Sequence, residues 1–170
     1  MRLFQGKIAI IAKDIADALV RGGDIETDSP AEVELDCEAV LKEYLRVERE
    51  ITERAKDMLE KRKLPYSQFG KARKLIADER GVGVGEDVIE YLANQIIGSF
   101  MHSVHVEEVF SPDETMRAKM APILRKHMAV DEEVDAEVRT KIKNLEEGTR
   151  TWEIEYQRVM EQIKRRRGLE

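Results

Sequence analysis

The chain has 170 residues, of which 38 % are charged and only 5 % aromatic, and its formal net charge is -6. This composition is typical of helices with charged outer faces, and the net acidity argues against a general polyanion binder. No run approaches the roughly 18 consecutive apolar residues that span a bilayer. Lys13, Asp14 and Asp17 would interrupt the apolar region of a signal peptide. These features predict a cytoplasmic protein that does not cross a membrane.

The first half of the chain is predicted to form a short helix, a long helix and a second short helix. Residues 7–20 place apolar side chains three and four positions apart, as on one helix face. Ser29, Pro30 and Glu32 form a helix-start signal, and we expect that long helix to end at residue 62, before Leu64 and Pro65. Its apolar stripe is Val33, Cys37, Val40, Tyr44, Val47, Ile51, Ala55 and Met58. A third helix is expected over residues 66–79.

The second half repeats this plan. Residues 122–139 match residues 39–56 at an offset of 83, and the stripes match position by position from Val33 with Met116 to Ala55 with Val138. A period of this length indicates a duplicated supersecondary unit. We therefore predict an all-α protein of six main helices in two tandem three-helix repeats, short-long-short. A pseudo-twofold axis would relate the repeats, and the long helices would form the spine.

Two domains follow from the repeat, residues 1–85 and residues 86–170, which we expect to act as one cooperative unit. The glycines of residues 81–85 follow a predicted helix and lack the spacing of a dinucleotide-binding loop, so they are interpreted as a joint. The single cysteine, Cys37, excludes an internal disulfide and a thiolate metal cluster within one chain. Its place on the apolar stripe predicts a buried, unreactive thiol.

Two basic segments are candidates for binding a polyanion. Residues 61–74 mix six bases with two aromatic residues around a turn, which suits phosphate contact and base stacking. The candidate residues are Lys61, Arg62, Lys63, Lys71, Arg73, Lys74, Arg165 and Arg166. Cations near a helix C-terminus also offset the helix dipole, so a solvated helix end is the alternative. Convergence of the two segments on one face would favour nucleic-acid binding.

Three other sets of polar residues and one aromatic residue have expected roles. His102, His105 and Glu108 lie within seven residues and are weak candidates for a metal site, against the alternative of a surface loop. His127 takes the stripe position of Tyr44, which predicts a partly buried structural imidazole. Glu48 and Glu50 correspond to Asp131 and Glu133, and we expect them to form a solvated charge belt. Phe69, which aligns with Trp152, is expected in the core.

Several tracts of the chain resemble one bacterial protein family. These are MRLFQGKIAIIAKDIADALV at residues 1–20, LDCEAVLKEYLRVEREITERAKDMLEKRKLPYSQFG at residues 35–70, HSVHVEEVF at residues 102–110 and WEIEYQRVMEQIKRRRGL at residues 152–169. Together they are similar to the family catalogued as domain of unknown function 507. The resemblance covers essentially the whole chain and implies a cytoplasmic helical protein. It assigns no activity, cofactor or catalytic residue.

The residues favour a non-catalytic helical interaction or scaffold protein without a cofactor. Its expected partner is another protein, with a homodimer possible if part of an apolar stripe stays exposed. The second interpretation is an RNA- or DNA-associated factor that uses residues 61–74 and 164–167. The third is a metal-dependent enzyme that uses His102, His105 and Glu108.

Overall fold

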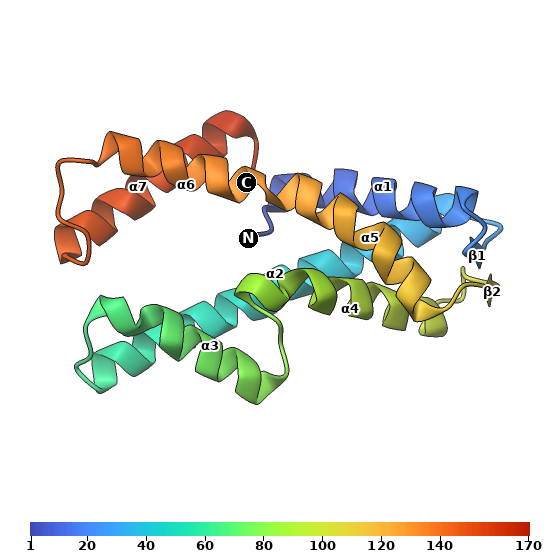
Figure 1. Ribbon diagram of the computed structural model, residues 1–170, viewed down its shortest axis with the longest axis horizontal. Coiled ribbons are helices and arrows are strands. Elements are labelled where there is room, and N and C mark those ends of the chain that lie inside the picture. The colour runs from blue at the N-terminus through green and yellow to red at the C-terminus, as the bar shows by residue number, and fades with distance from the viewer.

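The computed structural model describes all 170 residues, and most of them are helical (Figure 1). The seven helices are α1 (Ile8–Arg21), α2 (Pro30–Lys61), α3 (Phe69–Arg80), α4 (Val88–His102), α5 (Asp113–Met128), α6 (Val130–Lys141) and α7 (Arg150–Arg167). Two-residue strands, β1 (Ile25–Glu26) and β2 (Glu108–Val109), follow α1 and α4. The prediction of an all-α protein is confirmed. None of the helices combines the length and the apolar character needed to cross a membrane.

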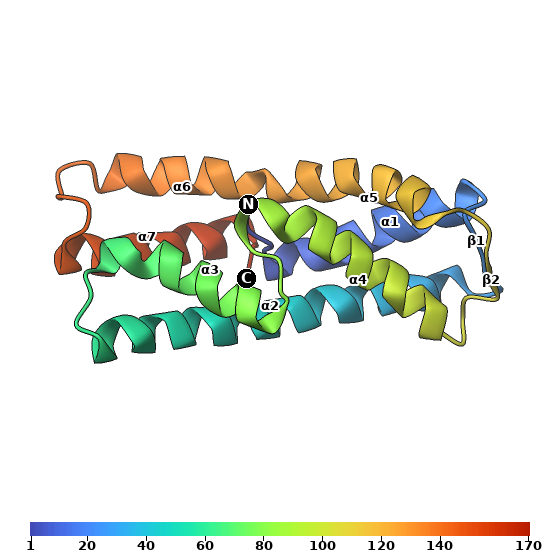
Figure 2. The same ribbon diagram turned by 60° about the horizontal axis from the view of Figure 1, so that its bottom comes forward.

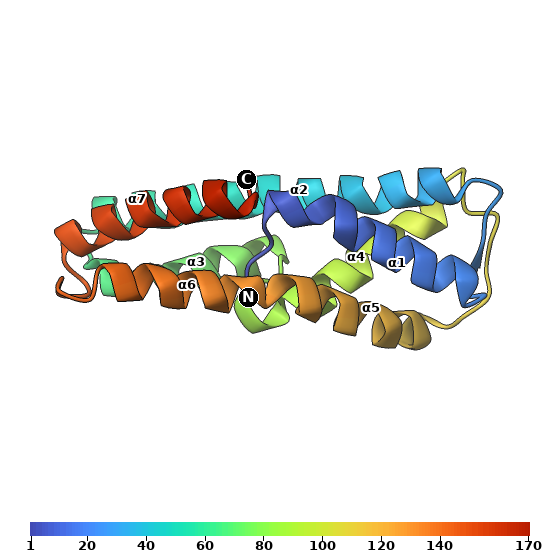
Figure 3. The ribbon, with the colours of Figure 1, turned by 90° about the horizontal axis from the view of Figure 1, so that it is seen from above.

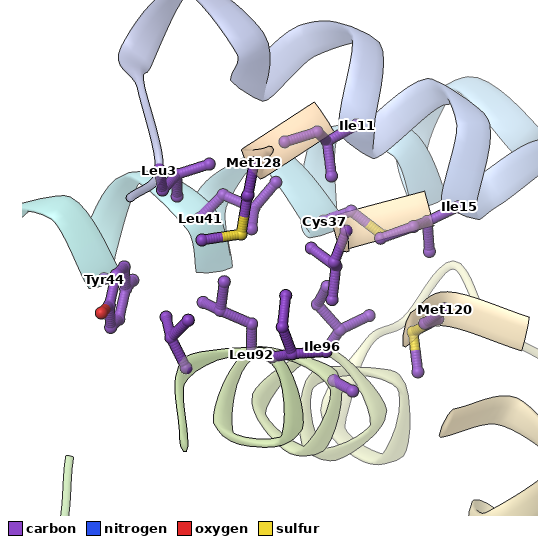
Figure 4. Packing of buried hydrophobic residues seen from close by; sticks show 14 of the residues in the cluster. Leu3, Ile11, Ile15, Cys37, Leu41, Tyr44, Leu92, Ile96, Met120 and Met128 are labelled. Atoms are coloured by element: carbon purple, nitrogen blue, oxygen red, sulfur yellow. The ribbon is translucent and has the colours of Figure 1, made fainter. Parts of the chain in front are cut away.

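Four helices form one half of the molecule, here called the four-helix body. α1 packs on α2, α2 on α4, α4 on α5 and α5 on α1, so the helices form a closed ring. Figure 4 shows side chains from all four helices meeting inside it, among them Ile15, Cys37, Ile96 and Met120. Cys37 is buried, as predicted. This core of 31 buried residues takes side chains from both sides of the expected boundary at residue 85.

Two helical hairpins extend from the body as separate arms (Figures 1 and 3). The first arm is residues 45–80, in which the C-terminal part of α2 packs on α3. The second arm is residues 130–167, in which α6 packs on α7. The first arm shares the body core, whereas the second has a separate core of nine buried residues, Phe4, Val134, Val138, Ile142, Trp152, Val159, Met160, Ile163 and Leu169.

The second long helix differs from the prediction. The expected single helix is interrupted at Ala129, which separates α5 from α6 and gives seven helices where six were predicted. The backbone at Ala129 remains near helical geometry (φ -62°, ψ -19°), and its N–H still donates to the Arg125 carbonyl. The chain is therefore bent at this point and not broken: α6 follows α5 in line in Figure 2, whereas Figure 1 shows the two helices at an angle.

The predicted helix-start signals are only partly correct. Pro30 occupies the first turn of α2 as expected, but the Ser29 hydroxyl caps no backbone N–H. Ser111 does not cap α5 either: the N-cap residue there is Pro112, and the Ser111 hydroxyl instead donates to the buried Asp24 carboxylate at 2.6 Å. A hydrogen bond to an ionised carboxylate is stronger than a hydrogen bond between two neutral groups. The capped helix is α7, where the Thr149 side chain accepts from the Trp152 N–H.

A small antiparallel ribbon closes the end of the body that lies opposite the arms (Figures 1 and 2). In it, Ile25 pairs with Val109 and Glu26 with Glu108. Residues 102–108 were expected to form a surface loop, and the ribbon was not predicted. Two residues per strand are too few to give a periodic signal.

Candidate functional site

The main concave surface is a groove of about 700 Å³ between the two arms, here called the inter-arm groove. One wall is a face of α2 whose residues recur three and four apart, at Leu45, Glu48, Arg49, Thr52, Glu53 and Lys56. This spacing points all six side chains in one direction. The opposite wall is a face of α7 with Gln157, Glu161 and Lys164. The groove is therefore built by two helices that belong to different arms.

The N-terminal segment forms part of the groove lining and joins the two cores. Leu3 belongs to the body core, whereas its neighbour Phe4 belongs to the core of the second arm. The Gly6 N–H donates to the Leu169 carbonyl at 3.2 Å, so the segment after α7 is held against the segment before α1. These contacts fix the base of the second arm next to the body.

Charges of both signs line the inter-arm groove. Glu48 accepts a hydrogen bond from Arg73 at 2.8 Å, and both side chains are largely buried. Asp131, the counterpart of Glu48 in the sequence alignment, also lines the groove. Burial raises the pKa of Asp131, although the N-terminal ammonium at 3.8 Å and Arg2 act in the opposite direction. The expected solvated charge belt is thus wrong for these two carboxylates, because the base of the groove encloses them.

The other two acids of that expected belt lie at the surface. Glu50 pairs with Arg46 and Arg80, and Glu133 pairs with Arg167 at 3.2 Å. Because these side chains have long, exposed partners, their contribution to stability is small.

A stacked aromatic pair lies at the start of the first arm's second helix. The rings of Tyr66 and Phe69 are 5.3 Å apart and nearly parallel, and both line the inter-arm groove. Burial raises the pKa of Tyr66, and the negative charge of Glu153 from the second arm adds to this effect. Phe69 was expected in the core but is only half-buried, whereas its counterpart Trp152 is buried. The difference arises because Phe69 faces the groove.

The basic candidates divide into paired and unpaired groups. Four make ion pairs within the chain: Arg73 with Glu48, Lys74 with Asp78 and Asp87, Arg165 with Glu170, and Arg166 with Glu137. The other four make none: Lys61, Arg62, Lys63 and Lys71. Residues 61–63 lie at the far tip of the first arm, whereas α7 ends near the middle of the molecule (Figures 1 and 2). The exposed, unpaired bases at the tip therefore lie far from the end of α7, whereas one residue of each basic segment, Arg73 and Lys164, lines the inter-arm groove.

The histidine-containing loop is held by hydrogen bonds and does not gather metal ligands. His102 ends α4, and Glu108 lies in β2 opposite Glu26. The Nε2 atom of His105 is 3.6 Å from a Glu32 carboxylate oxygen. No three His, Cys, Asp or Glu side chains are close enough together to hold a metal ion.

Two polar groups inside the fold hold helices together. His127 is buried, as predicted, and its Nε2 lies 2.7 Å from a carboxylate oxygen of Asp14 on α1. Asp24, which the sequence analysis did not single out, is also buried and accepts from Lys119 Nζ at 2.6 Å. Both contacts join segments far apart in the sequence: His127 joins α5 to α1, and Asp24, in the connection after α1, joins that connection to Lys119 on α5. A sequence pattern alone does not reveal such pairs.

The place of residues 1–5 in the groove was not predicted from the sequence. Leu3 and Phe4 are apolar residues that precede the first helical pattern, so periodicity assigns them no face. Their position outside a helix was the one available signal, since an apolar pair before a helix often packs on a neighbouring core.

The arrangement defines an all-α protein with two arms and an open groove between them. The chain belongs to the family described as protein of unknown function (DUF507), whose model matches residues 1–169. The resemblance noted from the sequence is therefore confirmed. A comparison with curated proteins found no match.

Proposed function

We propose that the protein is a non-catalytic, cytoplasmic interaction protein that holds a segment of a protein partner in the inter-arm groove. The observation that carries this proposal is the groove itself, which lies between arms that do not pack on each other. An open surface of this kind offers side chains from two helices to a bound segment.

The chemistry of the lining favours a polypeptide as the bound segment. Five acids (Glu48, Glu53, Asp131, Glu161 and Glu170) and five bases (Arg2, Arg49, Lys56, Arg73 and Lys164) line the groove together with the Tyr66–Phe69 pair. A polyanion would be repelled by half of these charges, whereas a peptide with charges of both signs can match them. The partly buried aromatic side chains supply apolar contact area for its other residues.

Site-specific photo-crosslinking tests this proposal. A photoreactive amino acid at Thr52, which lines the groove, should crosslink a discrete protein in cells. The matched control places the same group at Arg54, which is exposed about half a turn away on α2 and does not line the groove. Equal crosslinking from both positions, or none from Thr52, would contradict the proposal.

Binding of the identified partner should then depend on the shape of the groove. Thr52→Trp would fill part of it and should weaken binding about tenfold, which corresponds to ~1.4 kcal/mol. Arg54→Trp adds the same bulk outside the groove and should leave the affinity unchanged. Isothermal titration with purified partner gives both values.

The second candidate function is nucleic-acid binding through the tip of the first arm. The observation in its favour is that Lys61, Arg62, Lys63 and Lys71 have no carboxylate partner within the chain. Reversing all four charges should abolish binding to RNA or DNA and flatten the dependence of affinity on salt. Unchanged binding by this variant would reject the hypothesis.

We also propose that the architecture is a tandem duplication with a pseudo-twofold axis. Positions 83 apart are buried alike along the long helices, as in Cys37 and Met120, Ile51 and Val134, and Ala55 and Val138. The packing of α1 on α5 likewise mirrors that of α4 on α2.

A further inference from the structure

The ribbon end of the four-helix body exposes several large apolar side chains. Val104 is 88 % exposed, and Leu35, Met101 and Phe110 are each more than half exposed. All four belong to the segments that meet at this end: the start of α2, the end of α4, and the connections on either side of β2. Single exposed apolar residues are ordinary, but several at one end of a molecule indicate a contact surface.

The loop that carries Val104 has a defined shape. The Ser103 hydroxyl donates to Asp36 on α2 and accepts from the His105 N–H at 3.1 Å. On the other side, the His105 carbonyl accepts from the Thr27 hydroxyl. Val104 is thus held outward between two anchored residues, and contact with it would require little ordering of the loop.

The same end carries acids that have no cationic partner. Glu26 and Glu108 lie directly opposite each other across the ribbon, although like charges in this position destabilise a strand pair. Neither makes an ion pair, and the same holds for the exposed side chains of Asp28, Glu107, Asp113 and Glu114. Asp113 and Glu114 offset the dipole of α5, but this explanation does not apply to the ribbon carboxylates. A cationic group from another molecule would relieve their repulsion.

The opposite end of the molecule offers a complementary surface. At the tip of the first arm, Lys61, Arg62 and Lys63 are exposed and unpaired, and the next residue, Leu64, is 42 % exposed. Lys63 is in the left-handed region (φ 52°) and Pro65 restricts the following backbone, so this turn has a fixed shape. Figures 1 and 2 place the tip and the ribbon at opposite ends of the long axis.

We propose that the ribbon end binds the basic tip of a second copy of this chain, in a head-to-tail contact. Lys61, Arg62 and Lys63 would face Glu26, Glu107 and Glu108, while Leu64 would contact Val104. The two surfaces are different and lie at opposite ends, so the contact does not close on itself and builds linear assemblies. The area is small, and we expect a dissociation constant of about 10–100 µM. This proposal is independent of the inter-arm groove.

Charge reversal tests the proposal on the full-length protein. In sedimentation velocity at low salt, the wild-type chain should form larger species as its concentration rises, and high salt should weaken this association about tenfold. A tip variant (Lys61→Glu, Arg62→Glu, Lys63→Glu) and a ribbon variant (Glu26→Lys, Glu107→Lys, Glu108→Lys) should each remain monomeric. A mixture of the two should associate again, because the reversed tip of one then meets the reversed ribbon of the other.

The controls separate this contact from general electrostatic effects and from nucleic-acid binding. Arg54→Glu, Arg125→Glu and Lys126→Glu change the net charge by as much as the tip variant does, at exposed residues without ion pairs, and should leave association intact. Val104→Ser, which keeps every charge, should weaken association severalfold. A wild-type chain that stays monomeric at low salt, or association that survives either reversal alone, would overturn the proposal. Nucleic-acid binding at the tip would be insensitive to the ribbon variant, whereas self-association would not.

Discussion

Asp24 shows how one buried residue fixes the ribbon end. Only 1 % of it is exposed, and its carboxylate accepts from Lys119 Nζ and the Ser111 hydroxyl, both at 2.6 Å. Burial by itself would raise the pKa of Asp24, but the hydrogen bonds from Lys119 and Ser111 and the charge of Lys119 outweigh it, so the pKa lies below its usual value. The Asp24 carbonyl also accepts from Phe110, which ties the segment after β2 to the end of α1.

Replacing Asp24 by Asn should lower the free energy of unfolding at neutral pH by about 2 kcal/mol, because a charged pair is lost from a buried site. Because folding lowers the pKa of Asp24, its ionised form stabilises the protein above the unfolded value of about 3.9, and this contribution disappears as the pH falls through the folded pKa. Urea unfolding at pH 7 and below pH 3 should therefore show a difference between the two proteins that shrinks in acid. An equal difference at both pH values would contradict this account.

The contact between His127 and Asp14 joins α5 to α1. It predicts that replacing Asp14 destabilises the protein more than replacing Asp17, which lies on the same helix. Asp14→Ala should cost about 1–2 kcal/mol, since it leaves the buried imidazole without a partner. Asp17→Ala on the same helix removes an exposed pair with Lys13 and should cost less than about 0.5 kcal/mol. Chemical denaturation of both variants checks the order, and a larger effect at Asp17 would refute it.

At the scale of helices, the apolar stripes were predictable because each long helix repeats buried positions every three or four residues. Val33, Ile51, Met116 and Val138 are all fully buried, as their periodicity indicated. Periodicity does not report which helix a stripe faces, so the separation into a shared core and a second-arm core could not be predicted. The interruption at Ala129 was also hidden, because neither Gly nor Pro stands at the junction to break the helical pattern, and Ala129 itself is a strong helix former.

The contact between the two terminal segments makes Gly6 intolerant of a side chain. A Cβ atom at Gly6 would lie 2.0 Å from the Gly168 carbonyl oxygen and 2.9 Å from Leu169 Cα. Gly6→Ala should therefore displace the end of α7 and destabilise the second arm by about 1–3 kcal/mol. Gly98→Ala is the matched control: it lies within α4 with no neighbour within 4 Å, and should be neutral or stabilising by up to about 1 kcal/mol.

Hydrogen exchange gives the readout for the Gly6 variant. Amides near Ile163 and Leu169 should exchange faster in Gly6→Ala than in the wild-type protein, while those of α1 and α4 should change little. Uniform acceleration throughout the chain would show that the contact supports the whole fold and not the second arm alone.

On the scale of the whole molecule, the two cores predict two levels of stability. The body core contains 31 buried residues and the second-arm core only nine. Because fewer apolar contacts resist local opening, amides of α6 and α7 should show lower protection from hydrogen exchange than those of α1 and α4. Equal protection in both regions would mean that the second arm opens only with the body.

The candidate site was less predictable than the helices. The positive charge of residues 61–74 made them candidates for binding a polyanion. In the fold, however, Arg73 forms an ion pair with Glu48 and Lys74 forms one with Asp87. The inter-arm groove was not foreseen, because its walls come from segments more than 100 residues apart and its lining mixes charges that each look like ordinary surface residues. Only the packing of the arms assigns such residues to one surface.

The contact of Phe4 and Gly6 with Leu169 has a consequence for synthesis on the ribosome. The body core uses residues up to Met128 and can assemble once they have left the exit tunnel, since domains fold as their last elements emerge. The second-arm core combines Phe4 with residues as late in the sequence as Leu169, so it can be completed only after Leu169 has left the exit tunnel. Of the two cores, the second-arm core is therefore the later one to form during synthesis.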